Sequence, residues 1–166
     1  MVTLYNVISS DGFIARLDGS EDFIPDEVWN DLLDICKNYD TVVVGRKTYE
    51  TILAYPQAMI KKFEDLKIQK IVVTNDNNFT AKPGYIITHS PKEAFSIGQN
   101  ILLTSGPTLN SSALSEGLID KVILNTLPDK INVGIKVFNN DPKLIPLSSI
   151  DKPNNRKLCF YSISKI

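Results

Sequence analysis

Short apolar runs alternate with segments of helical periodicity from one end of the chain to the other. The apolar runs predict strands at residues 2–8, 42–44, 70–73, 85–87 and 101–104. The run at 42–44 is entirely β-branched and has no polar alternation, which is typical of a strand covered on both faces. The pattern therefore predicts an α/β fold with a mainly parallel central sheet between two layers of helices.

The segments between these strands carry helix signals. A helix opened by Pro25 and Asp26 has one apolar face, made of Trp29, Leu32, Leu33 and Cys36. Further helices are predicted at 46–53 and 59–66. Residues 90–93 (Ser-Pro-Lys-Glu) combine an N-cap serine, a first-turn proline and a capping-box glutamate. A last helix follows Ser105-Gly106-Pro107 and is expected to end near Gly117.

The C-terminal part of the chain has a different pattern, because its apolar runs at 121–124, 133–138 and 158–163 have no helices between them. Consecutive strands without a crossover pair antiparallel, so the sheet should be mixed, with an antiparallel C-terminal edge. Residues 9–20 predict a polar loop with Asp-Gly turn signals. Neither a repeat nor a long linker interrupts the sequence, so residues 1–166 are expected to form a single domain.

Charge and composition narrow the function classes. Eighteen Lys and Arg nearly balance nineteen Asp and Glu, and the sequence has no basic stripe, which argues against nucleic-acid binding. The N-terminus has no positively charged leader, and no apolar run approaches the roughly 20 residues of a membrane span. We therefore expect a cytoplasmic protein whose partners include neither nucleic acid nor membrane.

Cysteine and histidine are too few for several chemistries. Cys36 and Cys159 are isolated and fall in apolar patterns, which favours reduced core thiols over a reactive pair. His89 is the only imidazole, so a zinc site would lack ligands and no metal is expected. Hydrolysis by a Ser/His/Asp triad would have to use this same histidine.

The first of two strand-to-helix junctions that carry candidate chemistry lies at residues 45–48. Gly45 lets the chain turn sharply, and the free N–H groups of the next helix point at whatever binds there. Arg46, Lys47 and Thr48 add a planar fork, a point charge and a hydroxyl, which suits a phosphate dianion. The alternative is a solvated helix start, but cationic residues are unfavourable at the positive end of the helix dipole.

The second junction has compact residues that permit close backbone approach to a pyrophosphate. It consists of Ser105, Gly106, Pro107, Thr108 and Leu109. Taken alone, a Gly-Pro helix entry is more often a helix start and nothing else. Two such junctions in one small α/β domain indicate a ligand with two anionic groups. The glycine patterns of Rossmann and P-loop nucleotide sites do not occur in the sequence, so neither site is predicted.

Several strings together resemble the dihydrofolate reductase superfamily, and within it the reductase domain of riboflavin biosynthesis and its small single-domain relatives. The matching strings are residues 9–15 (SSDGFIA), 44–50 (VGRKTYE), 72–75 (VVTN), 105–109 (SGPTL) and 117–122 (GLIDKV). Each string is weak alone, whereas their joint occurrence in the family's order is fairly specific. The resemblance implies a dihydrofolate-reductase-like three-layer α/β/α fold.

The resemblance also implies an NADPH-dependent reductase. By this match the adenosine 2′-phosphate is held at Gly45, Arg46, Lys47 and Thr48, and the adenosine is bordered by Thr74 and Asn75. Residues 105–109 line the pyrophosphate and the nicotinamide. The family has Gly-Gly at this second junction, often joined by a cis peptide, whereas this chain has Ser105 in place of the first glycine. A homodimer is compatible with the resemblance.

The family's substrate residues are only partly present. Dihydrofolate reductases bind the pterin through a carboxylate on the first helix, at a position that is Trp29 here. Asp26 and Asp31 lie nearby, but at spacings that turn their side chains to other faces of the helix. The riboflavin reductases follow Asp-Gly with a lysine, here Phe13, and their phosphate-gripping Asp-Pro and Arg do not occur in residues 48–56.

Asp11, with Ser9 beside it, is the candidate catalytic carboxylate, and its alternative role is a turn aspartate bonded to its own loop. Gly12, Phe13 and Trp29 are candidate pocket residues, and the two aromatic ones could equally be core. We expect an NADPH-dependent reductase that transfers a hydride to a C=N carbon of a small heterocyclic pyrimidine or pterin, of the 5-amino-6-(5-phosphoribosylamino)uracil reductase type. A dihydrofolate reductase-type pterin reductase and a catalytically silent NADPH-binding module are the alternatives.

Overall fold

The computed structural model describes residues 1–164 and contains one eight-stranded sheet. Its strands are β1 (Val2–Ile8), β3 (Thr41–Gly45), β4 (Gln69–Val73), β5 (Tyr85–Thr88), β6 (Ile101–Leu103), β7 (Lys121–Thr126), β9 (Leu144–Lys152) and β10 (Arg156–Ile163). Their spatial order is β5-β4-β3-β6-β1-β7-β10-β9. Neighbours from β5 to β7 pair in parallel, whereas β10 runs antiparallel to β7 and to β9. The predicted mixed sheet with an antiparallel C-terminal edge is confirmed.

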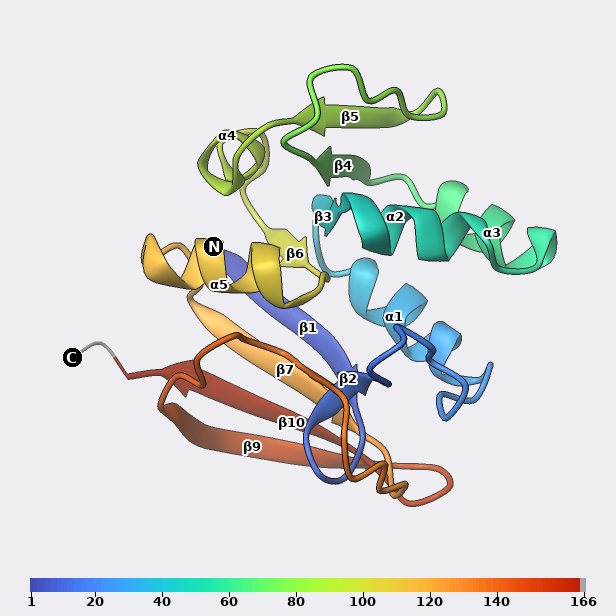
Figure 1. The fold of residues 1–166 in the computed structure, drawn as a ribbon, viewed down its shortest axis with the longest axis vertical. Coiled ribbons are helices and arrows are strands. Elements are labelled where there is room, and N and C mark those ends of the chain that lie inside the picture. Colours follow the sequence, from blue (N-terminus) through green and yellow to red (C-terminus); the bar gives the residue numbers. More distant parts are fainter. Residues whose placement is uncertain (165–166) are drawn as a thin grey trace.

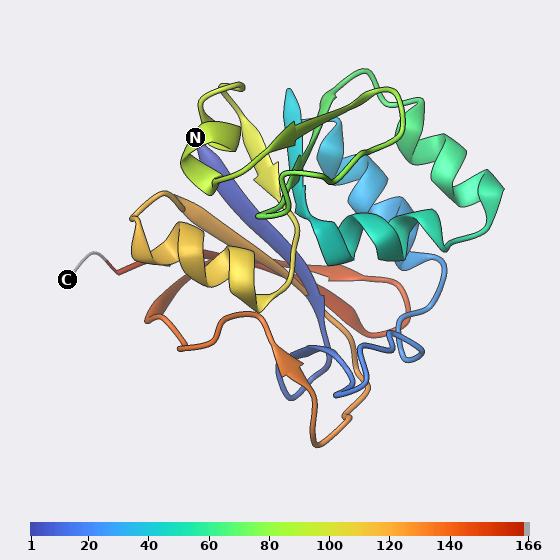
Figure 2. The same cartoon turned by 45° about the horizontal axis from the view of Figure 1, so that its top comes forward.

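Helices cover both faces of this sheet (Figures 1 and 2). One face carries α1 (Val28–Cys36), α2 (Arg46–Leu53) and α3 (Gln57–Glu64), and the other carries α4 (Pro91–Phe95) and α5 (Pro107–Ser115). Successive side chains of a strand point to opposite faces. Val42 and Val44 accordingly pack with residues of α1, α2 and α3, while Val43 packs with residues of α4 and α5. This alternation confirms the predicted three layers.

Two helices begin at positions other than those predicted. Residues 25–27 form a tight turn with hydrogen bonds from Val28 N to Pro25 O and from Trp29 N to Asp26 O, so α1 itself begins at Val28. The helix predicted at 59–66 spans Gln57–Glu64, because Pro56 adopts an extended conformation and serves as its N-cap. The predicted cap of α4 is confirmed, since the Ser90 hydroxyl accepts a hydrogen bond from the backbone N–H of Glu93.

The prediction of a strand at 133–138 in the main sheet is wrong. Only Ile135–Lys136 form a strand, β8, and it pairs with the short β2 (Phe13–Ala15) in a separate two-stranded sheet. Val137 and Phe138 are buried in the α4 and α5 side of the core, so the apolar character of this run serves packing. The loop predicted at 9–20 therefore contains β2, which lies beside β1 (Figure 1).

The sequence pattern did not indicate β9, the strand at the edge of the sheet beyond β10. Its nine residues are mostly exposed, so there is no buried face to impose a period of two on the apolar positions. Pro146 also argues against a strand, but a proline is tolerated at an edge because its missing N–H has no partner strand to serve there.

Candidate active site

The two predicted junctions lie side by side at the carboxyl ends of the parallel strands. β3 and β6 are parallel neighbours, so the starts of α2 and α5 both follow the carboxyl ends of adjacent strands. The backbone N–H of Gly45 donates to the Ser105 hydroxyl at 3.0 Å, which ties the junctions together. A Cβ at position 45 would lie 2.7 Å from this hydroxyl oxygen. The Ser105 hydroxyl therefore leaves no room for a side chain at position 45.

Both helices begin without a side-chain cap. The N–H groups of a helix's first turn have no partner inside the helix, so at these two starts they are available to an anion. Gly106, the N-cap of α5, has φ −85° and ψ 179°, and a Cβ there would meet no atom within 4 Å. Peptide bonds among residues 1–164 are all trans, including the one between Ser105 and Gly106. Open space thus lies in front of an uncapped helix start.

Two buried asparagines, which the sequence reasoning did not single out, fix the backbone of the second junction. The side-chain amides of Asn6 and Asn110 both donate to the carbonyl oxygen of Ser105, at 2.9 and 3.0 Å. The amide nitrogen of Asn110 also lies 3.1 Å from the side-chain oxygen of Asn6. Asn6 lies in the mainly apolar strand β1, and Asn110 is fully buried in α5. An amide inside a mainly apolar run is the signal that could have identified Asn6, whereas Asn110 lies among polar residues of α5 and carries no such signal.

The first turn of α2 and the segment after β4 meet at Arg46. The guanidinium donates from Nε to Glu50 at 3.0 Å and from Nη1 to Asp76 at 2.9 Å, and it lies over the ring of Phe79. The hydrogen bond to Glu50 raises the pKa of Arg46 further above its ordinary value, which keeps the group charged. Lys47 is exposed and the Thr48 side chain is half-buried.

Thr74 and Asn75 follow β4, in which Val73 is the register partner of Gly45. They therefore lie beside the start of α2, as the expectation for an adenosine site requires. Thr74 is buried, and its carbonyl oxygen lies 2.7 Å from Nδ1 of His89, while Asn75 is exposed. The structure thus brings residues 45–48, 74–75 and 105–109 to one edge of the sheet.

Asp11 lies in the loop that follows β1, the strand next to β6. Its carboxylate accepts hydrogen bonds from the Ser9 hydroxyl at 2.7 Å and from the backbone N–H groups of Ile131 and Asn132, at 3.2 and 2.8 Å. These bonds, that of Ser9 first, lower the pKa of Asp11 below its ordinary value. Asp11 is therefore ionised at neutral pH and anchors the β7–β8 loop as well as its own.

The three candidate pocket residues lie in different surroundings. Gly12 has φ +92°, which the tight turn between β1 and β2 requires, and Phe13 is half-buried in β2. Trp29 is in the core, where its indole N–H donates to the carbonyl oxygen of Met59 and its ring packs edge-on against Tyr55. Trp29 thus packs against Tyr55, Met59 and Phe63.

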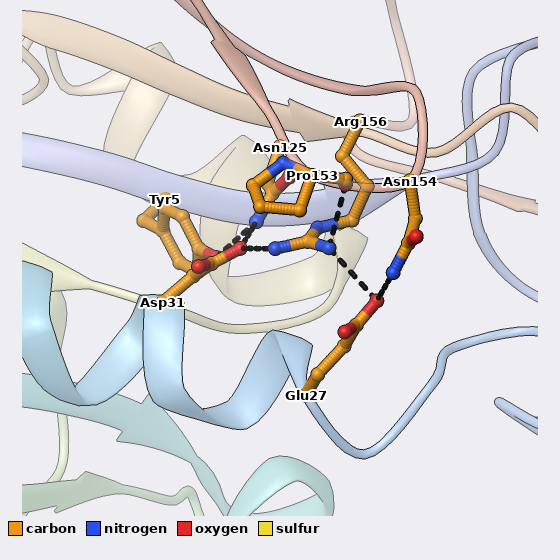
Figure 3. A network of polar contacts seen from close by, with 7 residues as sticks. All are labelled: Tyr5, Glu27, Asp31, Asn125, Pro153, Asn154 and Arg156. Atoms are coloured by element: carbon orange, nitrogen blue, oxygen red, sulfur yellow. Dashed lines mark hydrogen bonds and ion pairs between the residues drawn. The ribbon is translucent and has the colours of Figure 1, made fainter.

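A polar network joins α1 to the C-terminal strands (Figure 3). Arg156, which is 5% exposed, donates to Asp31 at 3.0 Å and to Glu27 at 2.9 Å. Asp31 also accepts a hydrogen bond from the side-chain amide of Asn125, and this amide lies 3.1 Å from the hydroxyl of Tyr5. Burial raises the pKa of Tyr5 far above its ordinary value. The partners come from α1 and its N-cap Glu27, β1, β7 and β10, so sequence spacing gave no indication of the network.

The described residues contain neither a metal-binding cluster nor a membrane-spanning helix. Within residues 1–164, no three or more His, Cys, Asp or Glu side chains gather so that they could hold a metal ion. The helices in that range are also too short, or too polar, to cross a bilayer.

A family model described as the RibD C-terminal domain matches residues 1–131. This chain belongs to that family, the reductase domain of riboflavin biosynthesis. The domain is also similar to the uncharacterized protein YwjB of Bacillus subtilis, with 28% identity over 153 residues that cover 85% of this chain and 86% of that protein. Membership fits the two junctions and the mixed sheet described above.

Solved structures share the fold of this RibD-type domain. One is a diaminohydroxyphosphoribosylaminopyrimidine deaminase/5-amino-6-(5-phosphoribosylamino)uracil reductase of Thermotoga maritima, with a TM-score of 0.71, 18% identity and coverage of 99% of this chain but 56% of that one. Another is a dihydrofolate reductase of Enterococcus faecalis complexed with NADP(H), with a TM-score of 0.66, 15% identity and coverage of 99% and 97%. The expected dihydrofolate-reductase-like fold is confirmed.

Proposed function

We propose that this chain is an NADPH-dependent reductase that transfers a hydride to a C=N carbon of a small pyrimidine, of the 5-amino-6-(5-phosphoribosylamino)uracil reductase type. The observation that carries the proposal is the pair of uncapped helix starts at the carboxyl ends of β3 and β6, joined through Gly45 and Ser105. Family membership supports a reductase of riboflavin biosynthesis. Ligands of open α/β sheets bind at this edge.

The residues at the two junctions fit a dinucleotide. Open space in front of Gly106 admits a group that a side chain would displace, and the free N–H groups of α5 favour an anion such as a pyrophosphate. At the other junction, Arg46, Lys47 and Thr48 would hold the 2′-phosphate, with Thr74 and Asn75 beside the adenosine. Asn6 and Asn110 keep the backbone of Ser105 in place by their hydrogen bonds to its carbonyl oxygen.

The bound nicotinamide would supply the hydride, and the chain would position the substrate. The Ser9 hydroxyl and the N–H groups of Ile131 and Asn132 hold Asp11 as a carboxylate, so it can accept a hydrogen bond from a substrate donor. A carboxylate with a lowered pKa is a poor proton donor at neutral pH, so the proton that completes the reduction would come from water. Asp11 is therefore proposed as an anchor for the substrate.

The first helix favours a pyrimidine over a pterin. Pterin reduction of the dihydrofolate reductase type uses a carboxylate on this helix, and Trp29 stands at the matching position in the core. Asp31 is the less exposed of the two carboxylates of α1, but its Oδ2 already accepts from Arg156 and Asn125. An ion-paired carboxylate has less to offer a cationic ring, so the pterin alternative has the weaker support.

The test is a turnover assay on the purified chain with NADPH and the ribosylamino-pyrimidine intermediate, followed by nicotinamide absorbance and by mass spectrometry of the product. We expect NADPH oxidation matched by a substrate gain of two hydrogens. Dihydrofolate serves as the competing substrate, and faster turnover with it would establish the pterin alternative. Tight NADPH binding with no turnover of either substrate would instead identify a catalytically silent module. The variant Gly106→Ala, placed where the cofactor would lie, is the negative control.

A further inference from the structure

The guanidinium of Arg46 is engaged by two carboxylates. Its Nε donates to Glu50 and its Nη1 to Asp76, and its carbon lies 5.0 Å from the centre of the Phe79 ring. Two of its three nitrogens are therefore committed to protein acceptors. One positive charge faces two negative ones at the place where the proposed function puts a phosphate dianion.

The two carboxylates reach Arg46 from different elements. Glu50 lies one turn further along the same helix, an ordinary i,i+4 pair. Asp76 comes from the segment after β4, where its Oδ1 accepts from the N–H of Asn78 at 2.9 Å and its own N–H donates to the Thr74 hydroxyl at 3.2 Å. These bonds fix Asp76 at the carboxyl end of β4, beside the first turn of α2. Asp76 therefore borders the space that the 2′ substituent of an adenosine ribose would occupy.

In dinucleotide sites, the side chain beside the ribose 2′ position determines the preference for NADH or NADPH. An acidic side chain in such a site accepts a hydrogen bond from the ribose 2′-hydroxyl of NADH, whereas an arginine pairs with the 2′-phosphate of NADPH. This chain has both kinds of side chain, because Nη1 of Arg46 lies 2.9 Å from Oδ2 of Asp76. A 2′-phosphate that reaches Arg46 must displace Asp76 or lie against it as a like charge, while a 2′-hydroxyl meets an acceptor.

We propose that Asp76 is a specificity-determining residue that limits the preference of this site for NADPH over NADH. The inference rests on the proposed function, because it assumes that a nicotinamide dinucleotide binds at the two junctions. It goes further by assigning opposite effects to the two members of one ion pair. Arg46 favours the phosphorylated cofactor and Asp76 favours the unphosphorylated one.

The test is direct titration of the purified chain with NADPH and with NADH by calorimetry, which needs no substrate. Asp76→Asn keeps the size of the side chain and an oxygen for Asn78, and it removes the negative charge. We expect the ratio of the two dissociation constants to move toward NADPH by about tenfold, since a charge-assisted bond to the 2′-hydroxyl is lost and a like charge is removed. Asp65→Asn is the matched control, because Asp65 pairs with Lys61 on α3 and its loss changes net charge equally.

The outcomes separate the two proposals. If Asp76→Asn binds both cofactors with the wild-type ratio, or shifts toward NADH, Asp76 does not set specificity and the proposed function still stands. An equal shift in Asp65→Asn would assign the effect to overall charge and overturn the inference. If the wild-type chain binds neither cofactor, the proposed function itself fails.

Discussion

Gly106 has an ordinary extended backbone, so the chain conformation does not itself require a glycine there. Packing does not require a glycine there either, because an added Cβ would meet no protein atom within 4 Å. Neither the backbone nor the packing of the described residues therefore requires a glycine at this uncapped helix start, which agrees with the proposal that a ligand binds in front of it. Gly45 differs, since its Cβ would collide with the Ser105 hydroxyl.

Gly106→Ala should therefore separate stability from binding. We expect folding stability to change by less than about 1 kcal/mol, because the restriction of the unfolded chain by alanine is offset by the preference for glycine over alanine at an N-cap. NADPH affinity should fall by roughly tenfold or more, since the methyl group fills the cofactor's space. Thermal melting and cofactor titration measure the two effects. Gly45→Ala is the contrasting variant and should lower stability. Normal NADPH binding by Gly106→Ala would place the pyrophosphate elsewhere.

Asp11 is a second residue at which one substitution should separate two effects, here turnover and NADPH affinity. Asp11→Asn keeps the shape of the turn but leaves one fewer acceptor for Ser9, Ile131 and Asn132. We expect turnover to fall by roughly tenfold or more, about 1.4 kcal/mol in the barrier, with NADPH affinity unchanged. Steady-state kinetics and cofactor titration test this. Unchanged turnover would assign Asp11 to the loop alone.

The pH dependence of stability gives Asp11 an independent readout. Its folded-state pKa is lowered, first by the Ser9 hydroxyl, so its contribution to stability is present above the ordinary carboxyl pKa of about 3.9. That contribution is lost as the pH falls through the lowered folded value. Asp11→Asn cannot titrate, so acid unfolding below this pH should be less steep in the variant than in the wild type. Parallel acid titrations would show that the carboxylate adds no stability.

At the scale of elements, the start of α2 illustrates how much local sequence can predict. The strand 41–45, the glycine and the cationic first turn are contiguous, so both the helix and the candidate anion site were predictable from residues 42–49. Asp76 was not, because it reaches Arg46 only after β4 has paired with β3. The same holds for Asn6 and Asn110, which meet across 104 positions of sequence. Local strings identify junctions, and tertiary pairing decides what surrounds them.

Arg46→Ala tests whether the first turn of α2 contacts the cofactor. We expect the affinity for NADPH to fall by roughly tenfold or more and the affinity for NADH to stay nearly constant, because only the 2′-phosphate loses a charge-assisted partner. Titration of both cofactors measures this. Lys37→Ala, at the end of α1, removes one positive charge from a different helix and should change neither affinity. Equal losses of both cofactors in Arg46→Ala would show that this junction does not recognise the 2′-phosphate.

At the scale of the molecule, Arg156 connects the first helix to the C-terminal strands (Figure 3). Its removal leaves the Asp31 carboxylate, 12% exposed, without its cationic partner. We expect Arg156→Met to lower the free energy of unfolding by about 3 kcal/mol. Denaturant unfolding would measure the loss.

The neighbouring residue supplies the control for this prediction. Lys157 lies on the same strand, its side chain is 54% exposed, and its pair with Asp151 is long at 3.8 Å. Lys157→Met removes the same charge and should change stability by less than about 0.5 kcal/mol. Similar losses in both variants would mean that the strand, and not the buried ion pair, carries the effect.

The position of β1 in the sheet determines when, during synthesis, this strand can pair with its neighbours. β1 is the earliest-made strand of this sheet and lies between β6 and β7, so residues 9–100 must be made before it can pair with either. At ordinary translation rates this interval lasts on the order of ten seconds. Throughout it, the apolar side chains of β1 have no partner strand, while β3, β4 and β5 can already pair with one another. A nascent chain arrested before residue 101 should therefore engage chaperones through its N-terminal segment and release them once β7 has emerged.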